Sequence, residues 1–335
     1  MVIPFSSVQQ ESDAGSFSMD TSSDGSFPRV PTVAVLLCTY NGERFLREQL
    51  DSIGRQTHPD WVVAVSDDGS TDSTLKILQE YREKWGENKL RVFSGPRRGF
   101  AANFISLTCE IEVQCDFYAW ADQDDIWCDR KLTTALDQLK VISQGVPALY
   151  CGRTELINED AHSIGLSPLF SRPATFRNAL VQSIGGGNTM VFNQEACQLI
   201  RDAGKDLNLV SHDWWAYLAV AGAGGHILYD PTPTILYRQH DDNIIGSNSS
   251  FSSRINRLRM VFEGRFRSWN ETNIHALESI DYRLSDENRS ILNNFRKARS
   301  YRGVRRFLFL RRSGVYRQTF LGNLGLVLAA IFNGI

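Results

Sequence analysis

Short apolar runs alternate with helical patterns through the first half of the chain. The run at 33–38 is typical of a strand buried on both faces, and the runs at 61–66, 90–94 and 117–121 predict three further strands. After three of these runs, apolar residues recur at the spacing of one helix face, and a further short helix follows "GPRRGFAANF". The spaced residues are Leu46, Leu50 and Ile53; Leu75, Leu78 and Tyr81; and Leu132, Leu136 and Leu139. Strands alternating with helices predict an α/β fold in which helices flank a mostly parallel sheet.

Polar clusters follow three of these strands directly. They are "TYNGE" at 39–43, "DDGSTD" at 67–72 and "DQDD" at 122–125. In parallel sheets, ligands bind at the carboxyl ends of the strands. We therefore expect the three clusters to line one cleft.

The third cluster crowds Asp122, Asp124 and Asp125 after an apolar aromatic run. Neighbouring carboxylates repel each other, and a hard divalent cation with oxygen ligands removes that repulsion. The alternative is a solvated turn in which an aspartate caps the next helix. The flanking aromatic residues and the two other polar strand ends favour a cation, which would in turn hold phosphates.

Asp67 and Asp68 begin the second cluster. Ser70, Thr71 and Asp72 are candidate helix caps, so part of the cluster could be a plain strand-to-helix turn. Two further carboxylates exceed what capping needs, and they could accept hydrogen bonds from a ribose hydroxyl or a base N–H. No G-x-x-x-x-G-K-[ST] loop occurs and no G-x-G-x-x-G follows the first strand, which argues against kinases and nicotinamide dehydrogenases.

Three motifs mark the second half: "GGGNT" at 185–189, "SHDWW" at 211–215 and "RQHDDN" at 238–243. Asp213 either caps a helix or acts as a general base, and the two tryptophans after it belong either to the core or to a surface that stacks on sugars. His240 is either a surface histidine or a partner of metal or phosphate. The glycines form either a plain loop or a close backbone approach to a ligand.

Charge divides the chain into an acidic body and a basic tail. Residues 251–335 hold 16 Lys and Arg against 6 Asp and Glu, whereas residues 1–250 hold 20 against 32. The last 16 residues form a mostly apolar stretch, shorter than the roughly 20 residues that span a membrane. This segment is either an interfacial anchor behind a basic collar or a helical cap that packs on the body.

Residues 1–30 are rich in Ser, Asp and Gly, and we expect them to be disordered. They lack the positive end and apolar stretch of a signal peptide. The six cysteines show no C-x-x-C pair. We therefore expect reduced thiols and a cytoplasmic location.

Taken in order, the motifs resemble glycosyltransferase family 2, the inverting nucleotide-sugar enzymes with a GT-A fold. The resemblance covers roughly residues 33–246, and "DQDDIW" and "HDWW" look like the bacterial rhamnosyltransferases of surface-polysaccharide assembly. It implies a GT-A nucleotide-sugar domain at 31–250, followed by a basic helical C-terminal region at 251–335.

The family pattern implies roles for individual residues. Asp213 matches the catalytic base, while His212 stands where the family has an acidic residue. Asp124 matches a ligand of Mg²⁺ or Mn²⁺, with Asp125 as a second candidate ligand and His240 completing the metal or diphosphate site. The nucleotide-sugar pocket would be lined by Thr39, Tyr40, Asn41, Glu43, Asp67, Asp68, Asn103, Asp122 and Gln123. Acceptor or sugar contacts would come from Gly186, Gly187, Asn188, Trp214 and Trp215.

The implied reaction moves a sugar, with rhamnose from dTDP-rhamnose as the best guess, to a hydroxyl of a glycan or lipid-linked saccharide. UDP-hexoses stay open as donors. Lipid-linked acceptors would place the protein on the inner face of the cytoplasmic membrane, where anionic head groups attract basic residues. Those residues include Arg305, Arg306, Arg311 and Arg312.

Three other interpretations compete with this one: a nucleotide-sugar binding protein without catalysis, nucleic-acid binding by the basic tail, and a nucleotidyltransferase. The tail contains no recognisable nucleic-acid module, so we expect no nucleic-acid partner. "TYNGE" is not the Gly-rich, Arg-containing loop that nucleotidyltransferases usually carry after the first strand.

Overall fold

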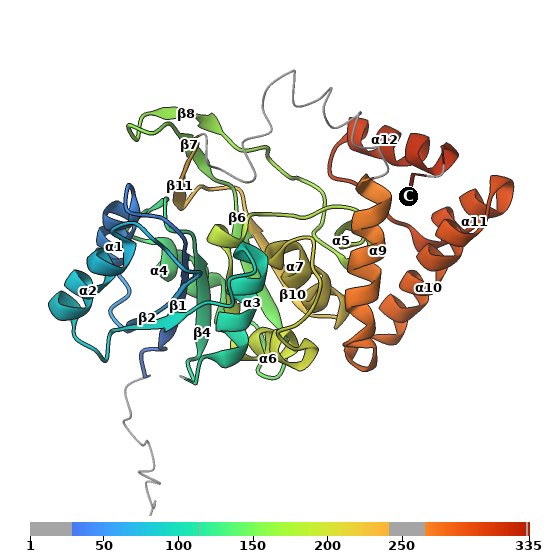
Figure 1. Ribbon diagram of the computed structural model, residues 1–335. Helices are drawn as coiled ribbons and strands as arrows, with labels where there is room; N and C mark the ends of the chain where they lie inside the picture. The colour runs from blue at the N-terminus through green and yellow to red at the C-terminus, as the bar shows by residue number, and fades with distance from the viewer. Residues whose placement is uncertain (1–28, 113, 241–264, 333) are drawn as a thin grey trace, which may run out of the picture. The chain divides into compact units, whose positions relative to one another are not determined.

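A seven-stranded sheet lies at the centre of the computed structural model, which describes residues 29–112, 114–240, 265–332 and 334–335 (Figure 1). The strand order is β10-β6-β9-β4-β1-β2-β3, and β9 alone pairs antiparallel with its neighbours. The strands are β1 Val33–Thr39, β2 Trp61–Asp67, β3 Leu90–Ser94, β4 Phe117–Ala121, β6 Ala148–Gly152, β9 Val191–Asn193 and β10 His226–Asp230. The expected α/β fold with a mostly parallel sheet is confirmed.

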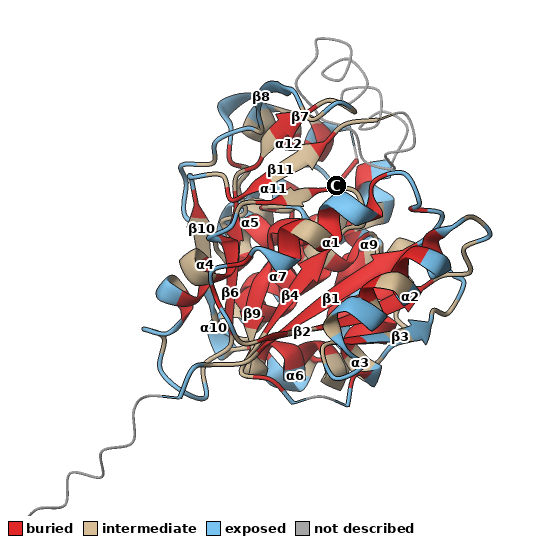
Figure 2. Ribbon diagram, turned by 90° about the vertical axis from the view of Figure 1, so that its left-hand side faces the viewer, coloured by how far each residue is buried: buried red, intermediate tan, exposed pale blue. Residues whose placement is uncertain are grey.

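Strand β1 is buried on both faces, as its apolar run predicted, and β2 beside it is buried at all but one position (Figure 2). Successive residues of β1 enter different cores: Val33 and Val35 pack on one side of the sheet, Ala34 and Leu36 on the other. Helices α1, α2 and α4 cover the first side, and α3, α6 and α7 cover the second. Their bounds are α1 Leu46–Gly54, α2 Thr74–Trp85, α3 Phe100–Glu110, α4 Lys131–Leu139, α6 Gln194–Ala203 and α7 His212–Gly222.

The predicted inner face of α2 is wrong at its first position. Leu78 and Tyr81 are buried as expected, but Leu75 is 49% exposed. Thr74 points inward instead, because its hydroxyl accepts a hydrogen bond from the Gly42 N–H at 2.8 Å. Leu75 is thereby left at the surface, beside the loop after β2.

Four strands that follow β4 in the sequence form a second sheet, in the order β5-β11-β7-β8. Its strands are β5 Ile126–Trp127, β7 Glu155–Ile157, β8 Ser163–Leu166 and β11 Ile235–Arg238. β11 pairs antiparallel with β5, which directly follows the "DQDD" cluster. This pairing brings residues 238–240 next to that cluster. The short elements are α5 Phe176–Ala179 and the 3₁₀ turns Gly187–Thr189 and Asp281–Arg283.

The C-terminal helical extension is confirmed. It consists of α9 Arg265–Glu278, α10 Asp286–Ser300, α11 Gly303–Ser313 and α12 Phe320–Ile331 (Figure 1). The extension packs on the body, since Asn178 Nδ2 donates to the Tyr316 carbonyl at 2.9 Å and Arg177 Nη1 to the Ser313 carbonyl at 2.8 Å. Within the described ranges, no helix has the length and apolar character to cross a membrane.

The expected domain boundary at residue 250 and nearly all of the expected disordered segment 1–30 lie outside the described residues. Both therefore stay predictions. All six cysteines are described, and none forms a disulfide.

Candidate active site

Gln123 joins the loops that follow β1 and β4. Its Oε1 accepts from the Tyr40 N–H at 2.8 Å, and its Nε2 donates to the Tyr40 carbonyl at 3.0 Å. A Cβ at Gly42 would lie 2.3 Å from Gln123 Oε1, so a side chain at this position would displace the Gln123 amide from Tyr40. Tyr40 as a residue is 59% exposed, and an exposed aromatic side chain can stack on a nucleobase.

Asn41 and Glu43 hold the β1 loop to the β2 loop. Asn41 has φ 48°, uncommon for a residue with a side chain, and its Oδ1 accepts from the Thr71 N–H at 2.8 Å. Glu43 Oε2 accepts from the Ser73 N–H at 2.8 Å. Both residues were expected to contact the nucleotide, and in the structure both join loops of the site.

Asp67 closes the turn after β2. Its carboxylate accepts from Thr39 Oγ1 at 2.9 Å and from Ser70 Oγ at 2.5 Å. It also accepts from the Gly69 and Ser70 N–H groups at 3.2 and 2.9 Å. Thr39 and Asp67, two expected nucleotide residues, therefore bond to each other.

Asp68 orders the loop between β3 and α3. Its two oxygens accept from the Arg97 N–H at 2.5 Å and the Gly99 N–H at 2.9 Å. Asn103 is buried inside α3, where it accepts from Ser66 Oγ at 2.6 Å and donates to the Ser66 carbonyl at 2.9 Å. These polar groups shape the loops around a pocket.

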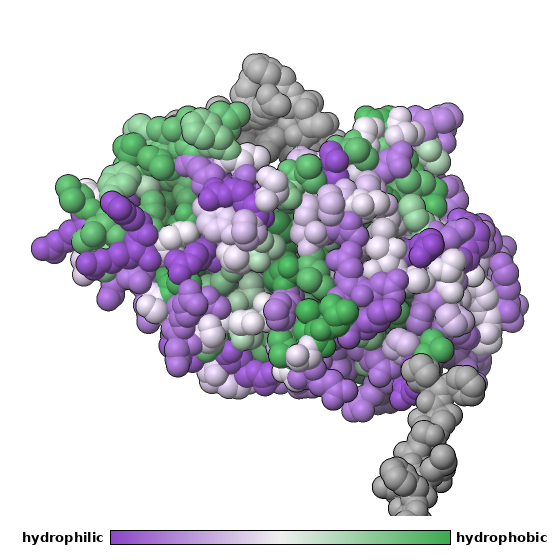
Figure 3. Space-filling view, turned by 180° about the vertical axis from the view of Figure 1, so that it is seen from behind, coloured by the Kyte–Doolittle hydropathy of each residue, from purple (hydrophilic) through white to green (hydrophobic). Residues whose placement is uncertain are grey.

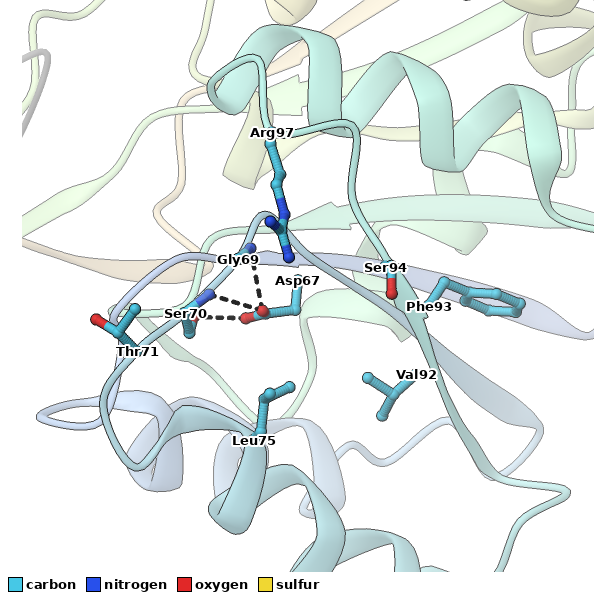
Figure 4. A pocket seen from close by; sticks show the side chains of 9 residues that line it. All are labelled: Asp67, Gly69, Ser70, Thr71, Leu75, Val92, Phe93, Ser94 and Arg97. Carbon is cyan, nitrogen blue, oxygen red and sulfur yellow. Dashed lines mark hydrogen bonds between the residues drawn. The ribbon is translucent and has the colours of Figure 1, made fainter.

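That pocket has a volume of about 350 Å³ and opens between the β2 turn and β3 (Figure 4). Arg97 lies on one side of it, with Leu75 and Val92 on the other. A planar ring fits between an apolar wall and a guanidinium, which stacks readily on flat groups. The lining residues are Asp67, Gly69, Ser70, Thr71, Leu75, Val92, Phe93, Ser94 and Arg97.

Asp122 lies among other carboxylates at the end of β4. Burial, followed by the negative charges of Asp124 and Asp213, raises the pKa of Asp122 to about 8. The fold thus brings Asp213, at the start of α7, within electrostatic reach of the "DQD" cluster. Crowded carboxylates whose pKa is raised are typical of functional sites, and a divalent cation would relieve their repulsion.

Asp124 and His240 form the pair best suited to a metal ion. His240 Nε2 lies 2.9 Å from Asp124 Oδ2, and the two side chains are 8% and 18% exposed. Carboxylate oxygen and imidazole nitrogen both bind divalent transition metals, so the donor chemistry fits Mn²⁺. No three His, Cys, Asp or Glu side chains of the described residues form a complete ligand set. The remaining ligands would come from water and a diphosphate, as is usual for such cations.

Asp125, the second expected metal ligand, is engaged elsewhere. Its side chain is fully buried and accepts from Asn188 Nδ2 at 2.5 Å and from the Arg238 N–H at 3.2 Å. With both oxygens bonded to protein donors, Asp125 ties β4 to β11 and to the "GGGNT" loop. The amide of Asn188, an expected sugar contact, is used in the same way.

Sequence reasoning missed Arg238, the last residue of β11. Its fully buried guanidinium donates through Nε to the Asp124 carbonyl at 3.0 Å and through Nη1 to the Glu159 carbonyl at 2.6 Å. Nη2 donates to the Glu48 carboxylate at 2.7 Å, and the group lies 4.4 Å from the Phe45 ring centroid. The sequence feature that could have indicated this role is the position of an arginine as the last residue of a mostly apolar strand. Arg238 fixes the main chain that carries the candidate metal ligand.

Asp213 lies in the first turn of α7. Its Oδ1 accepts from Ser211 Oγ and, at 2.6 Å, from the Trp214 N–H. Ser211 occupies the N-cap position, so capping does not account for the aspartate. Burial raises the pKa of Asp213 above the usual range of a carboxyl, which makes its ionised form a stronger base.

His212 is enclosed by aromatic rings and takes no part in this polar site. It stacks on Phe104 at 4.1 Å and meets Trp120 edge-on at 4.8 Å between ring centroids. Among the described residues neither ring nitrogen has a hydrogen-bond partner, and burial lowers the pKa of His212 to about 3, so the imidazole is neutral. A Cβ at Gly187 would lie 2.1 Å from His212 Nε2, which explains a glycine in the "GGGNT" loop. A Cβ at Gly186 would lie 2.7 Å from the Asn188 side-chain oxygen.

Trp214 and Trp215 belong to the core. Their exposed fractions are 6% and 0%, and Trp214 Nε1 donates to the Ala179 carbonyl at 2.7 Å. Neither ring offers an open face to a sugar in this structure. The burial of the two rings differs from the expected contact with an acceptor sugar. Helix α7 directs both rings into the hydrophobic core, where Trp214 meets Trp269 of α9.

Comparisons with known proteins identify the family. Residues 34–202 match the family described as Glycosyl transferase family 2. The dTDP-rhamnosyl transferase RfbG of Shigella flexneri is 30% identical over 239 residues, 67% of this chain and 78% of that protein. The putative teichuronic acid biosynthesis glycosyltransferase TuaG of Bacillus subtilis (strain 168) is 28% identical over 166 residues, 49% of this chain and 63% of that protein.

A solved structure supports the fold. The crystal structure of GalNAc-T7 with UDP, GalNAc and Mn²⁺ has a TM-score of 0.52 and 13% identity to this chain, covering 86% of this chain and 55% of that one. The GT-A arrangement that the resemblance implied is confirmed. Because the family match spans half of the chain, the protein belongs to glycosyl transferase family 2 and is a glycosyltransferase.

Proposed function

We propose that this glycosyltransferase is an inverting, metal-dependent enzyme that moves a sugar from a nucleoside diphosphate to a hydroxyl of a glycan or lipid-linked saccharide. The proposal rests on the place of Asp213, which lies buried in the first turn of α7 with its carboxylate held by Ser211 Oγ and the Trp214 N–H. From there its charge acts on Asp122, so a candidate base on α7 lies near the aspartates that follow β4. A binding protein without catalysis would not need a carboxylate of raised pKa at that position.

The reaction is a single displacement. The Asp213 carboxylate accepts the proton of the acceptor hydroxyl, whose oxygen forms a bond to the anomeric carbon. The bond from that carbon to the diphosphate oxygen breaks on the opposite side, and the nucleoside diphosphate leaves with the electron pair. One displacement without a covalent enzyme intermediate inverts the configuration of the sugar.

Asp124 and His240 would hold Mn²⁺ or Mg²⁺. A divalent cation at that position supplies Lewis-acid stabilisation of the negative charge on the leaving diphosphate. The chain's own contribution is to fix the two ligands: His240 follows β11, and Arg238 holds the Asp124 carbonyl at 3.0 Å. The donor atoms of these two side chains support a cation, whereas the Mn²⁺ named for GalNAc-T7 belongs to that protein.

We propose dTDP-rhamnose as the donor, with UDP-hexoses as the alternative. The motifs "DQDDIW" and "HDWW" and the name of the Shigella flexneri relative, a dTDP-rhamnosyl transferase, support rhamnose. The exposed Tyr40 ring and the pocket beside Arg97 offer two places where a pyrimidine base can stack. A lipid-linked acceptor would place the protein on the inner face of the cytoplasmic membrane.

Release of nucleoside diphosphate tests the proposal. Purified protein is incubated with dTDP-rhamnose or a UDP-hexose, Mn²⁺ and a lipid-linked saccharide extract, and the new linkage is analysed by NMR. We expect one donor to be consumed, an inverted anomeric configuration, and a loss of about 10²–10⁴-fold in rate for Asp213→Asn. Asp137→Asn, an exposed aspartate, is the matched control. Retention of configuration, or full activity of Asp213→Asn, would overturn the mechanism.

A further inference from the structure

The helix α12 exposes an apolar face that no other described part of the chain covers. Phe320, Leu321, Leu324 and Ile331 are 82%, 67%, 48% and 54% exposed. At 3.6 residues per turn they lie on one side of the helix. A Cβ added at Gly325 would meet no atom within 4 Å, which shows that this region is open.

The opposite face of α12 is equally apolar and is buried. Leu326, Ala329 and Ala330 are at most 5% exposed and belong to the core shared with the body. A hydrogen bond from Arg306 Nη1 to the Ala330 carbonyl, at 2.7 Å, ties the helix to α11. The exposed face is therefore presented by a fixed helix, and its apolar character is not required for packing in the described structure.

Positive charge accompanies this face. Residues 301–335 contain six arginines and no Asp or Glu. Arg302, Arg305, Arg311 and Arg312 are exposed, and within the described part of the chain none of them pairs with a carboxylate. In the view from behind, the green side chains of α12 lie at the upper left, beside the purple side chains of α11 (Figure 3). On α11, Val304 and Leu308 add 85% and 45% exposed apolar side chains.

We propose that the surface formed by α11 and α12 docks on an anionic lipid bilayer. A helix of 12 residues is about 18 Å long, which is too short to cross a bilayer but long enough to lie in its interface. The apolar face of α12 enters the boundary between head groups and acyl chains, while the arginines contact lipid phosphates. A second copy of the chain fits less well, because a symmetric contact would bring two arginine clusters together without carboxylates to neutralise them.

This inference rests on the proposed function, since a lipid-linked acceptor would be held at the same surface. Membrane docking and the glycosyl transfer itself can be tested separately. Lipid binding requires only α11 and α12, whereas donor binding requires the site at the carboxyl ends of β1, β2 and β4.

Vesicle flotation with the full chain tests the docking surface. Vesicles of neutral phosphatidylcholine are compared with vesicles that contain phosphatidylglycerol, at low and high salt. The apolar variant is Leu321→Gln/Leu324→Gln, and its matched control is Val141→Gln/Ile164→Gln, which changes two exposed apolar residues far from α12 in sequence. The charge variant is Arg311→Gln/Arg312→Gln, with Lys76→Gln/Arg91→Gln as its control. Donor binding and thermal unfolding are measured for every variant.

We expect the chain to bind anionic vesicles and to release them at high salt. The apolar variant should lower the partition coefficient about tenfold or more, the charge variant should lower it for anionic vesicles only, and the controls should match the unchanged chain. Donor binding should be the same in all variants. No binding to anionic vesicles, or binding that the apolar variant leaves intact, would overturn the inference. Sedimentation that shows a dimer lost in Leu321→Gln/Leu324→Gln would instead assign the surface to a second copy.

Discussion

His240 Nε2 and Asp124 Oδ2 lie 2.9 Å apart, although 116 positions separate the two residues in the chain. The first follows β11 and the second follows β4, and the pairing of β11 with β5 brings them together. Without a cation the two groups share a hydrogen bond. With a cation, both atoms are suited to bind it.

Replacing His240 with Asn tests this pair. Because one donor to the cation is lost while Asp124 stays, we expect donor affinity in Mn²⁺ to fall about 10–100-fold. Calorimetric titration with and without Mn²⁺ measures this affinity, and His162→Asn, at an exposed histidine just before β8, serves as control. Unchanged affinity in Mn²⁺ would remove His240 from the site.

Replacing Arg238 should lower both the stability of the fold and the affinity for the metal ion, because its guanidinium holds the main chain of Asp124. In Arg238→Met, the carbonyls of Asp124 and Glu159 lose a buried donor, and each such loss costs about 1–3 kcal/mol. Denaturant unfolding and Mn²⁺ titration should both show the loss. Arg44→Met is the matched control, because Arg44 pairs with Glu159 at the surface and such pairs contribute about 0–1 kcal/mol. Equal effects of the two changes would contradict a positioning role for Arg238.

Gly187 and His212 should be coupled in a double-mutant cycle. Gly187→Ala places a Cβ 2.1 Å from His212 Nε2, and overpacking of this kind costs about 1–3 kcal/mol. In Gly187→Ala/His212→Ala the clash is absent, so the two changes together should cost less than their sum by about 1 kcal/mol or more. Additive costs would show that the two residues do not meet. Gly325→Ala, on the open side of α12, is the control.

The pH dependence of turnover follows from Asp213. A general base must be ionised, and burial raises the pKa of Asp213. Activity should therefore be lost, as the pH falls, at a higher pH than for an ordinary aspartate of pKa about 3.9. His212 should add no inflection, because its lowered pKa of about 3 leaves it neutral throughout. A kcat profile that stays flat down to pH 4 would contradict this assignment.

Lys131 should lower stability at neutral pH. Its amine is buried 4.4 Å from the Trp127 ring centroid and makes no hydrogen bond within the part of the chain that the structure describes. Burial lowers the pKa of this amine from 10.5 to about 7. Between these values the unfolded chain binds more protons than the folded one, so stability should rise as the pH rises from 7 toward 10.

Lys131→Met keeps the apolar stem and removes the amine. We expect Tm at pH 7 to rise by about 2–4 °C and the increase in stability above pH 7 to diminish. Thermal unfolding at pH 7 and pH 9 measures both effects, with Lys140→Met on the surface as control. A lower Tm for Lys131→Met would mean that the amine stabilises the fold.

The sequence predicted the elements that carry the site better than it predicted the role of each side chain. Apolar runs followed by polar clusters located the ends of β1, β2 and β4, because a strand buried on both faces has few alternatives. They could not show that Asp125 points into protein, since its partners Asn188 and Arg238 come from distant segments. For the same reason the buried guanidinium of Arg238 was missed. The two tryptophans of "HDWW" fitted both a core and a sugar platform, and their burial in the folded chain, with Trp214 against Trp269 of α9, places them in the core.

Calorimetric titration of the unchanged chain and of Asp124→Ala with dTDP-rhamnose and with UDP-hexoses, with and without Mn²⁺, shows whether a cation at Asp124 holds the donor. We expect one donor to bind in the presence of Mn²⁺, and we expect Asp124→Ala to lose this metal-dependent part while its Tm stays the same. Binding of the donor that is equal with and without Mn²⁺, and equal in Asp124→Ala, would contradict a metal-assisted site at the end of β4.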